Sequence, residues 1–271
     1  MPNVSPVRWT VKKAARIGLV TASDLIGMPN LSAKPRLHVL TYHRFGPAIR
    51  DPFCVPRETF VRQMHWLARK NLAVSLEHLQ AFVLGAASLP GNAVLVTIDD
   101  ACSSVLSHAL PVLRDFAIPA VVYVPAMLVG TTAPSEFGER VLRWDELECL
   151  QKSGVTIGSH GLRHRSLGQM PYEMGREEVF ESRALLSSRL GTPVTSFAYP
   201  FGTRAHHNDM TRTLLRDAGY ETGFTSQHGG ISPGLDPLAL PRVKIESGEN
   251  DWMFQRICRG ALNGWALVDA L

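Results

Sequence analysis

The sequence predicts an α/β fold with about seven strands, a number that fits an incomplete (β/α) barrel. Apolar, strand-like runs alternate with helical patterns along most of the chain, as they do when parallel strands are joined by helices. The chain has 271 residues and 45% hydrophobic content, enough for the core of a single α/β barrel. No internal repeat or low-complexity tract interrupts it. We therefore expect one main domain.

The predicted strands are apolar and β-branched without polar residues at alternate positions, as in residues 93–98, Ala-Val-Leu-Val-Thr-Ile. In chain order they are residues 37–43, 93–98, 120–124, 155–158, 194–198, 220–224 and 240–245. Helical spacing of apolar residues predicts helices at 57–70, 103–116 and 172–190. Residues 124–144 are rich in Gly, Pro, Ser and Thr and predict a long loop above the strand ends, with helical spacing resuming at Trp144.

Two pairs of polar residues follow two of these strands directly. Asp99 and Asp100 come after the strand at 93–98, and His160 and His164 follow the strand at 155–158. The carboxyl ends of parallel strands are where ligands and catalytic groups gather in α/β folds, so we expect both pairs at one site. One carboxylate and two imidazoles suit a catalytic zinc or a similar ion.

The two aspartates are expected to have different roles. Consecutive side chains on extended backbone point to opposite faces, so both cannot easily bind one ion. If Asp100 joins His160 and His164 as a metal ligand, Asp99 is left as a general base that takes a proton from water. The alternative is structural, because an Asp pair can cap a helix and spaced histidines can be ordinary surface residues.

These residues carry a resemblance to a known family. The segments Thr97-Ile98-Asp99-Asp100, Ser159-His160 with His164, and residues 197–202 (Phe-Ala-Tyr-Pro-Phe-Gly) resemble the polysaccharide deacetylase family, also called carbohydrate esterase family four, over residues 36–246. The resemblance implies a distorted, incomplete (β/α) barrel, a base at Asp99, and one divalent metal on Asp100, His160 and His164. Zinc is the first expectation, with cobalt, nickel or manganese as alternatives.

The third segment is expected to bind the substrate. By resemblance, the Tyr199 N–H donates to the oxyanion that forms during amide hydrolysis, while Pro200 and Phe201 form a wall of the substrate groove. A simple turn after the strand at 194–198 is the alternative. His206, His207 and His228 are further loop candidates for substrate contact, although no motif spacing supports them.

The sequence departs from the commonest family pattern at two places. The expected Arg before this loop and the His near the C-terminus are both missing. The sequence is similar instead to a circularly permuted branch that includes poly-N-acetylglucosamine deacetylases, which implies His43 as the general acid. Arg242 is our candidate for the missing arginine, because a guanidinium beside Asp99 would hold that carboxylate ionised. The alternatives are a packed histidine and a solvated arginine.

The terminal segments, 1–35 and 247–271, lie outside the resemblance. Arg8, Lys12 and Arg16 fall on one helical face, which predicts either packing on the barrel or contact with an anionic membrane surface, and residues 252–265 could do likewise. The first segment is too short and polar to span a bilayer and lacks a convincing signal peptide, so we expect a cytoplasmic protein, with peripheral membrane contact as an option.

Composition narrows the partners further. A net charge of +4 and a pI near 9.0 are too mild to imply nucleic acid. The four scattered cysteines lack metal-knuckle spacing, and we expect free thiols. Nothing predicts an oligomeric state. The expected function is a metal-dependent N-deacetylase of a poly-, oligo- or lipid-linked saccharide. A hydrolase of a non-sugar amide or imide and a silent glycan-binding barrel are the alternatives.

Overall fold

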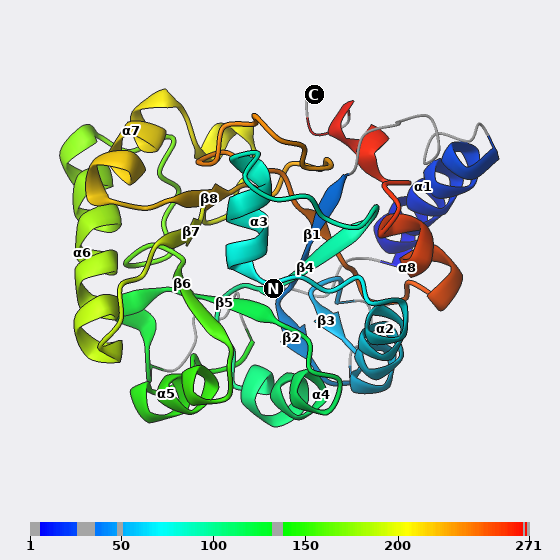
Figure 1. Ribbon diagram of the computed structural model, residues 1–271, viewed down its shortest axis with the longest axis horizontal. Coiled ribbons are helices and arrows are strands. Elements are labelled where there is room, and N and C mark those ends of the chain that lie inside the picture. Colours follow the sequence, from blue (N-terminus) through cyan, green and yellow to red (C-terminus); the bar gives the residue numbers. More distant parts are fainter. Residues whose placement is uncertain (1–5, 26–35, 48–50, 132–137, 268, 270–271) are drawn as a thin grey trace.

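The computed structural model describes residues 6–25, 36–47, 51–131, 138–267 and 269 (Figure 1). Seven parallel strands form one curled sheet in the order β8-β7-β6-β5-β4-β1-β9. Their bounds are β1 Leu37–Tyr42, β4 Ala93–Ile98, β5 Ala120–Val124, β6 Thr156–Ser159, β7 Ser196–Ala198, β8 Thr222–Phe224 and β9 Val243–Lys244. The predicted incomplete (β/α) barrel is confirmed.

The two edges of the sheet approach each other next to β8. Phe224, the last residue of β8, forms a parallel bridge with Leu240, which precedes β9. The Thr225 N–H also donates to the Leu240 carbonyl at 2.9 Å. The seam is therefore held by a short bridge rather than by a full strand pairing, so the barrel is distorted at this point.

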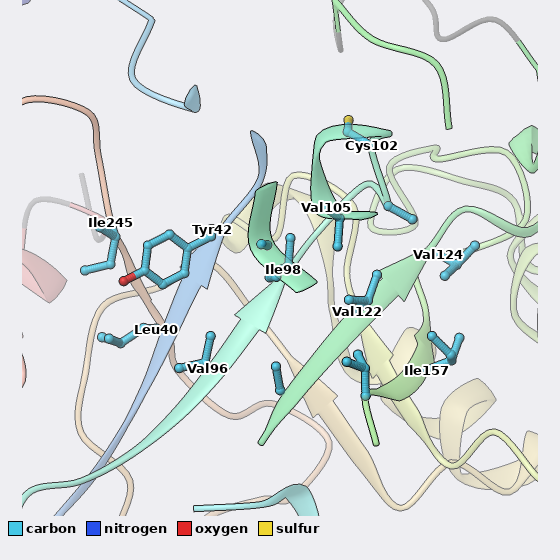
Figure 2. Packing of buried hydrophobic residues seen from close by; sticks show 14 of the residues in the cluster. Leu40, Tyr42, Val96, Ile98, Cys102, Val105, Val122, Val124, Ile157 and Ile245 are labelled. Atoms are coloured by element: carbon cyan, nitrogen blue, oxygen red, sulfur yellow. The ribbon is translucent and has the colours of Figure 1, made fainter. Parts of the chain in front are cut away.

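Both faces of the strands are buried, which explains their nearly continuous apolar sequence. On β4, Val94, Val96 and Ile98 join the core beneath the surrounding helices, as Figure 2 shows for two of them. Ala93 and Leu95 join a second core with residues from the other strands. By this alternation Thr97 and Asp99 continue the second face toward the carboxyl end of the barrel.

Helices surround the barrel and close its amino end. Those around the sheet are α2 Arg57–Lys70, α4 Leu110–Asp115, α5 Trp144–Lys152, α6 Tyr172–Leu190 and α7 Asp209–Ala218 (Figure 1). Helix α3, Leu76–Val83, packs its apolar side chains with Leu37 and Ala93 at the first positions of β1 and β4. Short strands β2 Arg44–Phe45 and β3 Cys54–Val55 pair beside the barrel mouth.

One predicted helix differs in the structure. Residues 103–116 were expected to form a single α-helix, but a π-helical turn, Val105–Ala109, precedes α4. Pro111 lacks an N–H and cannot continue the regular pattern, and the Leu110 N–H reaches back to Val105 instead. The turn begins after Ser104, so the aspartate pair does not cap it. Helices α3 and α7 and strands β2 and β3 were not predicted.

The N-terminal helix α1, Pro6–Leu25, packs against α8, Asp251–Ile257, and the short turn 263–267. Its basic residues face acidic ones on the barrel. The Lys12 Nζ lies 2.6 Å from Glu246, the Lys13 Nζ 3.1 Å from the same carboxylate, and the Arg16 Nη2 2.5 Å from Glu249. The packing alternative for this segment is therefore the one found in the structure.

Several predictions about the termini fall outside what the structure describes. The side chain of Arg8 and the residues at 26–35, where we placed the boundary of the main domain, are among them. In the described part of the chain, no helix is long and apolar enough to cross a bilayer. Contact with a membrane surface stays a prediction. The expected free thiols are confirmed: all four cysteines lie in the described residues, and none of them forms a disulfide.

Candidate active site

A pocket of about 300 Å³ opens at the carboxyl end of the barrel strands. It brings together eight of the nine residues predicted for the site, seven from the segments that follow β1, β4, β6 and β7 and one from the position just before β9. They are His43, Asp99, Asp100, His160, His164, Tyr199, Phe201 and Arg242. Pro200 does not line the pocket, because it is buried in the turn between Tyr199 and Phe201. The prediction that Pro200 contacts substrate is therefore not supported by this geometry.

Asp100, His160 and His164 form a group whose ligand atoms lie within 4.8 Å of one another. Each histidine Nε2 is 3.5 Å from the Asp100 Oδ1. In the described part of the chain, this is the single group of three such residues with metal-ligand spacing. Two imidazoles and one carboxylate at this spacing fit a catalytic divalent ion, with positions left for water and substrate.

The orientation of His160 is fixed by the neighbouring strand. Its Nδ1 lies 2.7 Å from the Ala198 carbonyl oxygen at the end of β7. A carbonyl can only accept, so the Nδ1 carries the proton and donates it. The Nε2 is then an unprotonated lone pair directed toward Asp100, as a metal ligand requires. Burial lowers the pKa of His160, which also favours the neutral ring.

Four residues at the site have a left-handed backbone conformation that residues other than glycine rarely adopt. Asp100, Ala101, His164 and Phe201 have φ values of 69°, 48°, 56° and 62°. The left-handed turn at Asp100 and Ala101 ends the extended path of β4 and separates the directions of the two carboxylates. Clusters of such residues are typical of functional sites, where the surrounding structure offsets their conformational cost.

Asp99 is held by Arg242 in a bidentate pair. The guanidinium Nη1 and Nη2 donate to the two carboxylate oxygens at 2.8 Å each, and both side chains are buried. Burial opposes ionisation of Asp99, but the Arg242 charge outweighs it and holds the pKa of this carboxyl well below its ordinary value. The geometry is that expected of Arg242 as the replacement for the missing arginine.

His43 lies directly after β1 and lines the same pocket as Asp99. Its ring packs edge-on against Phe53, with centroids 4.8 Å apart. Burial lowers the pKa of His43 to about 3, although the Asp99 carboxylate acts in the other direction. The imidazole is therefore neutral at pH 7. The structure brings His43 to the site, and its role as an acid stays a prediction.

The Tyr199 N–H is not available as an oxyanion donor, which corrects our expectation. It donates to the Phe224 carbonyl at 2.9 Å, because β7 and β8 continue their pairing through this position. The Tyr199 phenol donates to the Leu238 carbonyl. Two residues later, the Phe201 N–H has no hydrogen-bond partner among the described residues, and Phe201 lines the pocket. Its amide is the better candidate donor.

The loop histidines have separate positions. His206 lines the pocket and lies against Phe201, with ring centroids 5.1 Å apart. His207 packs on the Tyr199 ring instead, and His228 binds Asp269 through its Nδ1 at 2.9 Å. Pocket residues that we did not predict are Thr41, Arg44, Phe53, Thr203, Ser226 and Lys244. Only Lys244 had a usable signal, because it is two positions after Arg242 on a predicted strand.

Known structures share this arrangement of strands and helices. The structure named IcaB from Ammonifex degensii superposes with a TM-score of 0.72 and 28% sequence identity, covering 84% of this chain and 97% of that one. The Streptococcus pyogenes deacetylase PplD gives a TM-score of 0.73 at 20% identity, covering 84% and 99%. The second likeness supports the fold alone.

Sequence comparisons agree with the structural ones. The candidate polysaccharide deacetylase YxkH of Bacillus subtilis is 24% identical over 216 residues, 79% of this chain and 72% of that protein. Poly-β-1,6-N-acetyl-D-glucosamine N-deacetylase of Staphylococcus aureus is 20% identical over 214 residues, which cover 75% of this chain and 72% of that protein. The model of the polysaccharide deacetylase family matches residues 86–223, more than half of the 271. This chain belongs to the polysaccharide deacetylase family.

Proposed function

We propose that the protein is a metal-dependent N-deacetylase that hydrolyses the acetamide of N-acetylated sugars. The observation that carries the proposal is an ionised, arginine-held Asp99 beside the group of Asp100, His160 and His164 in one pocket. Family membership supports deacetylation of N-acetylated sugar polymers. The similarity to the poly-β-1,6-N-acetyl-D-glucosamine N-deacetylase of Staphylococcus aureus supports N-acetylglucosamine as the sugar, and a lipid-linked saccharide is a further proposed substrate.

Asp100, His160 and His164 would hold one divalent ion, for which zinc is our first choice. The fixed Nδ1 proton of His160 and the convergence of three ligand atoms are the features that fit such an ion. When bound, a divalent metal lowers the pKa of water and polarises an amide carbonyl. Cobalt, nickel and manganese also bind imidazole and carboxylate ligands, and they are the alternatives to zinc.

The side chains around this group would carry the protons of the reaction. Asp99 accepts a proton from the attacking water while the water oxygen bonds to the acetyl carbon. The Phe201 N–H donates to the carbonyl oxygen as negative charge develops on it. When the carbon–nitrogen bond breaks, His43 delivers a proton to the leaving amine. Since His43 starts neutral, the proton that it delivers is the one Asp99 took from water: Asp99 passes it to the imidazole and is ionised again, and the hydroxyl oxygen stays in the acetate.

Acetate release from N-acetylglucosamine oligomers, with zinc or cobalt added, tests this proposal. The Asp99→Asn variant should lose about 10²- to 10⁴-fold in kcat/KM, the usual contribution of a general base. It should still bind metal, whereas His160→Ala should not. Hydrolysis of small cyclic imides with inert oligomers would contradict the sugar assignment. A wild-type metal content below about a tenth of an equivalent after reconstitution would remove the ligand assignment.

A further inference from the structure

Lys244 is a pocket-facing ammonium group that the proposed reaction does not use. It is the last residue of β9, and Arg242 lies two positions earlier, immediately before that strand, so an extended backbone places both on one face. Both side chains line the pocket, with His43 and Phe53 nearby. The Lys244 Nζ lies 4.4 Å from the centroid of the Phe53 ring. The aromatic ring thus holds the end of the side chain at the pocket wall.

The charge of Lys244 is not neutralised by a direct partner. Within the described residues, no carboxylate oxygen lies within 4.0 Å of its Nζ. By contrast, the other two pocket cations are paired: Arg242 binds Asp99, and the Arg44 Nη2 lies 2.5 Å from Asp51. Burial lowers the pKa of Lys244 to about 8, and the group is still mostly protonated at pH 7.

The carboxylates that follow Lys244 in the chain or act on its pKa are engaged by other groups. Glu246 is bound by Lys12 and Lys13, and Glu249 by Arg16. Asp269 is bound by His228, through both the ring Nδ1 and the backbone N–H. With Lys244 included, four cations from Lys and Arg therefore face three carboxylates. Of these four cations, Lys244 is the one with no carboxylate oxygen within 4.0 Å among the described residues, and it lines the pocket.

We infer that Lys244 is a specificity residue that binds an acidic group, a carboxylate or a phosphate, carried by the glycan close to the acetamide. Such a group would supply the anion that the protein itself does not provide. A half-buried ammonium beside an aromatic ring gains more from an ionic partner than an exposed lysine does, because solvent screens it less. The inference rests on the proposed function and narrows its substrate class.

Binding measured without turnover tests this inference separately from the proposed function. Calorimetry on the metal-free protein would compare three oligosaccharides: neutral N-acetylglucosamine oligomers, oligomers that alternate N-acetylglucosamine with a uronic acid, and phosphorylated N-acetylglucosamine oligomers. We expect at least one acidic oligomer to bind about 10-fold more tightly than the neutral one, the size of one charge-assisted hydrogen bond. The acid that binds more tightly identifies the source of the anion.

Variants then assign the preference to this residue. Lys244→Met keeps an apolar stem against Phe53 and should abolish the preference, while Lys244→Arg should retain most of it. Lys13→Gln is the matched control, because it removes a cation from the same cluster outside the pocket and should leave the preference intact. Equal affinity of wild type for all three oligomers would overturn the inference, as would a preference that survives in Lys244→Met. Absence of acetate release from every oligomer would instead count against the proposed function.

Discussion

Replacement of Arg242 should move the acidic limb of the pH profile. The guanidinium and Asp99 form two hydrogen bonds of 2.8 Å, with side-chain exposures of 2% and 5%. Two unit charges about 4 Å apart interact by about 4 kcal/mol at an effective dielectric constant of about 20, which corresponds to about 3 pKa units. Without this cation, burial is the largest influence on the pKa of Asp99. Burial raises that pKa above its ordinary value of 3.8.

The direction of the effect follows from the role of Asp99 as a base. The carboxylate must be ionised to accept a proton, so activity falls as the pH falls through its pKa. In wild type that pKa is too low to limit activity in the usual range. In Arg242→Met the limb should appear at higher pH, and the loss of kcat/KM relative to wild type should grow as the pH is lowered from 8 toward 5.

The assay is kcat/KM for acetate release against pH, at saturating metal with bound metal measured at each pH. Removing one partner of a buried pair costs about 3–5 kcal/mol of unfolding free energy, so thermal unfolding must be recorded as well. Arg242→Lys keeps the charge but not the bidentate geometry and should show a smaller displacement. Arg16→Met breaks another buried pair, with Glu249, and is the control for destabilisation. Profiles of unchanged shape in both Arg242 variants would refute the reasoning.

Two further predictions concern the leaving group and the backbone. His43→Ala should reduce acetate release from N-acetylglucosamine oligomers by about 10²-fold or more but barely change hydrolysis of an activated aryl acetate, whose leaving group needs no proton; equal losses on both substrates would argue against an acid role. Ala117 is exposed and has a φ of 51° just after α4, a conformation that costs alanine more than glycine. Ala117→Gly should therefore raise the free energy of unfolding by about 1 kcal/mol, measured by chemical denaturation. A lower free energy of unfolding would mean that the methyl group contributes packing.

Local sequence patterns were sufficient to predict which three residues meet in the candidate metal group. Asp100, His160 and His164 follow strands whose apolar runs are easy to identify, and parallel strands bring their carboxyl ends together. The same logic placed Asp99 and Arg242 near each other, although their pairing spans 143 positions in the sequence. What the pattern could not supply was the distance between them, which depends on the curl of the whole sheet.

The errors arise where a long-range partner decides the outcome. The Tyr199 N–H was expected to be available, but its partner Phe224 belongs to β8, and no residue near Tyr199 indicates that this pairing extends past β7. The role of the basic residues in α1 was left open because their acidic partners, Glu246 and Glu249, lie more than two hundred positions away. In both cases hydrogen bonding across the fold determined which groups remained accessible.

The order of the strands in the sheet also has a consequence for synthesis of the protein. The three residues proposed to hold the metal have all been translated by residue 164, and their strands, β4 to β6, are neighbours in the sheet. Arg242 comes near the end of the chain and reaches Asp99 only when β9 pairs with β1. A chain truncated before residue 242 would therefore carry the proposed metal ligands with Asp99 unpaired, so the site is complete only when β9 has joined the sheet.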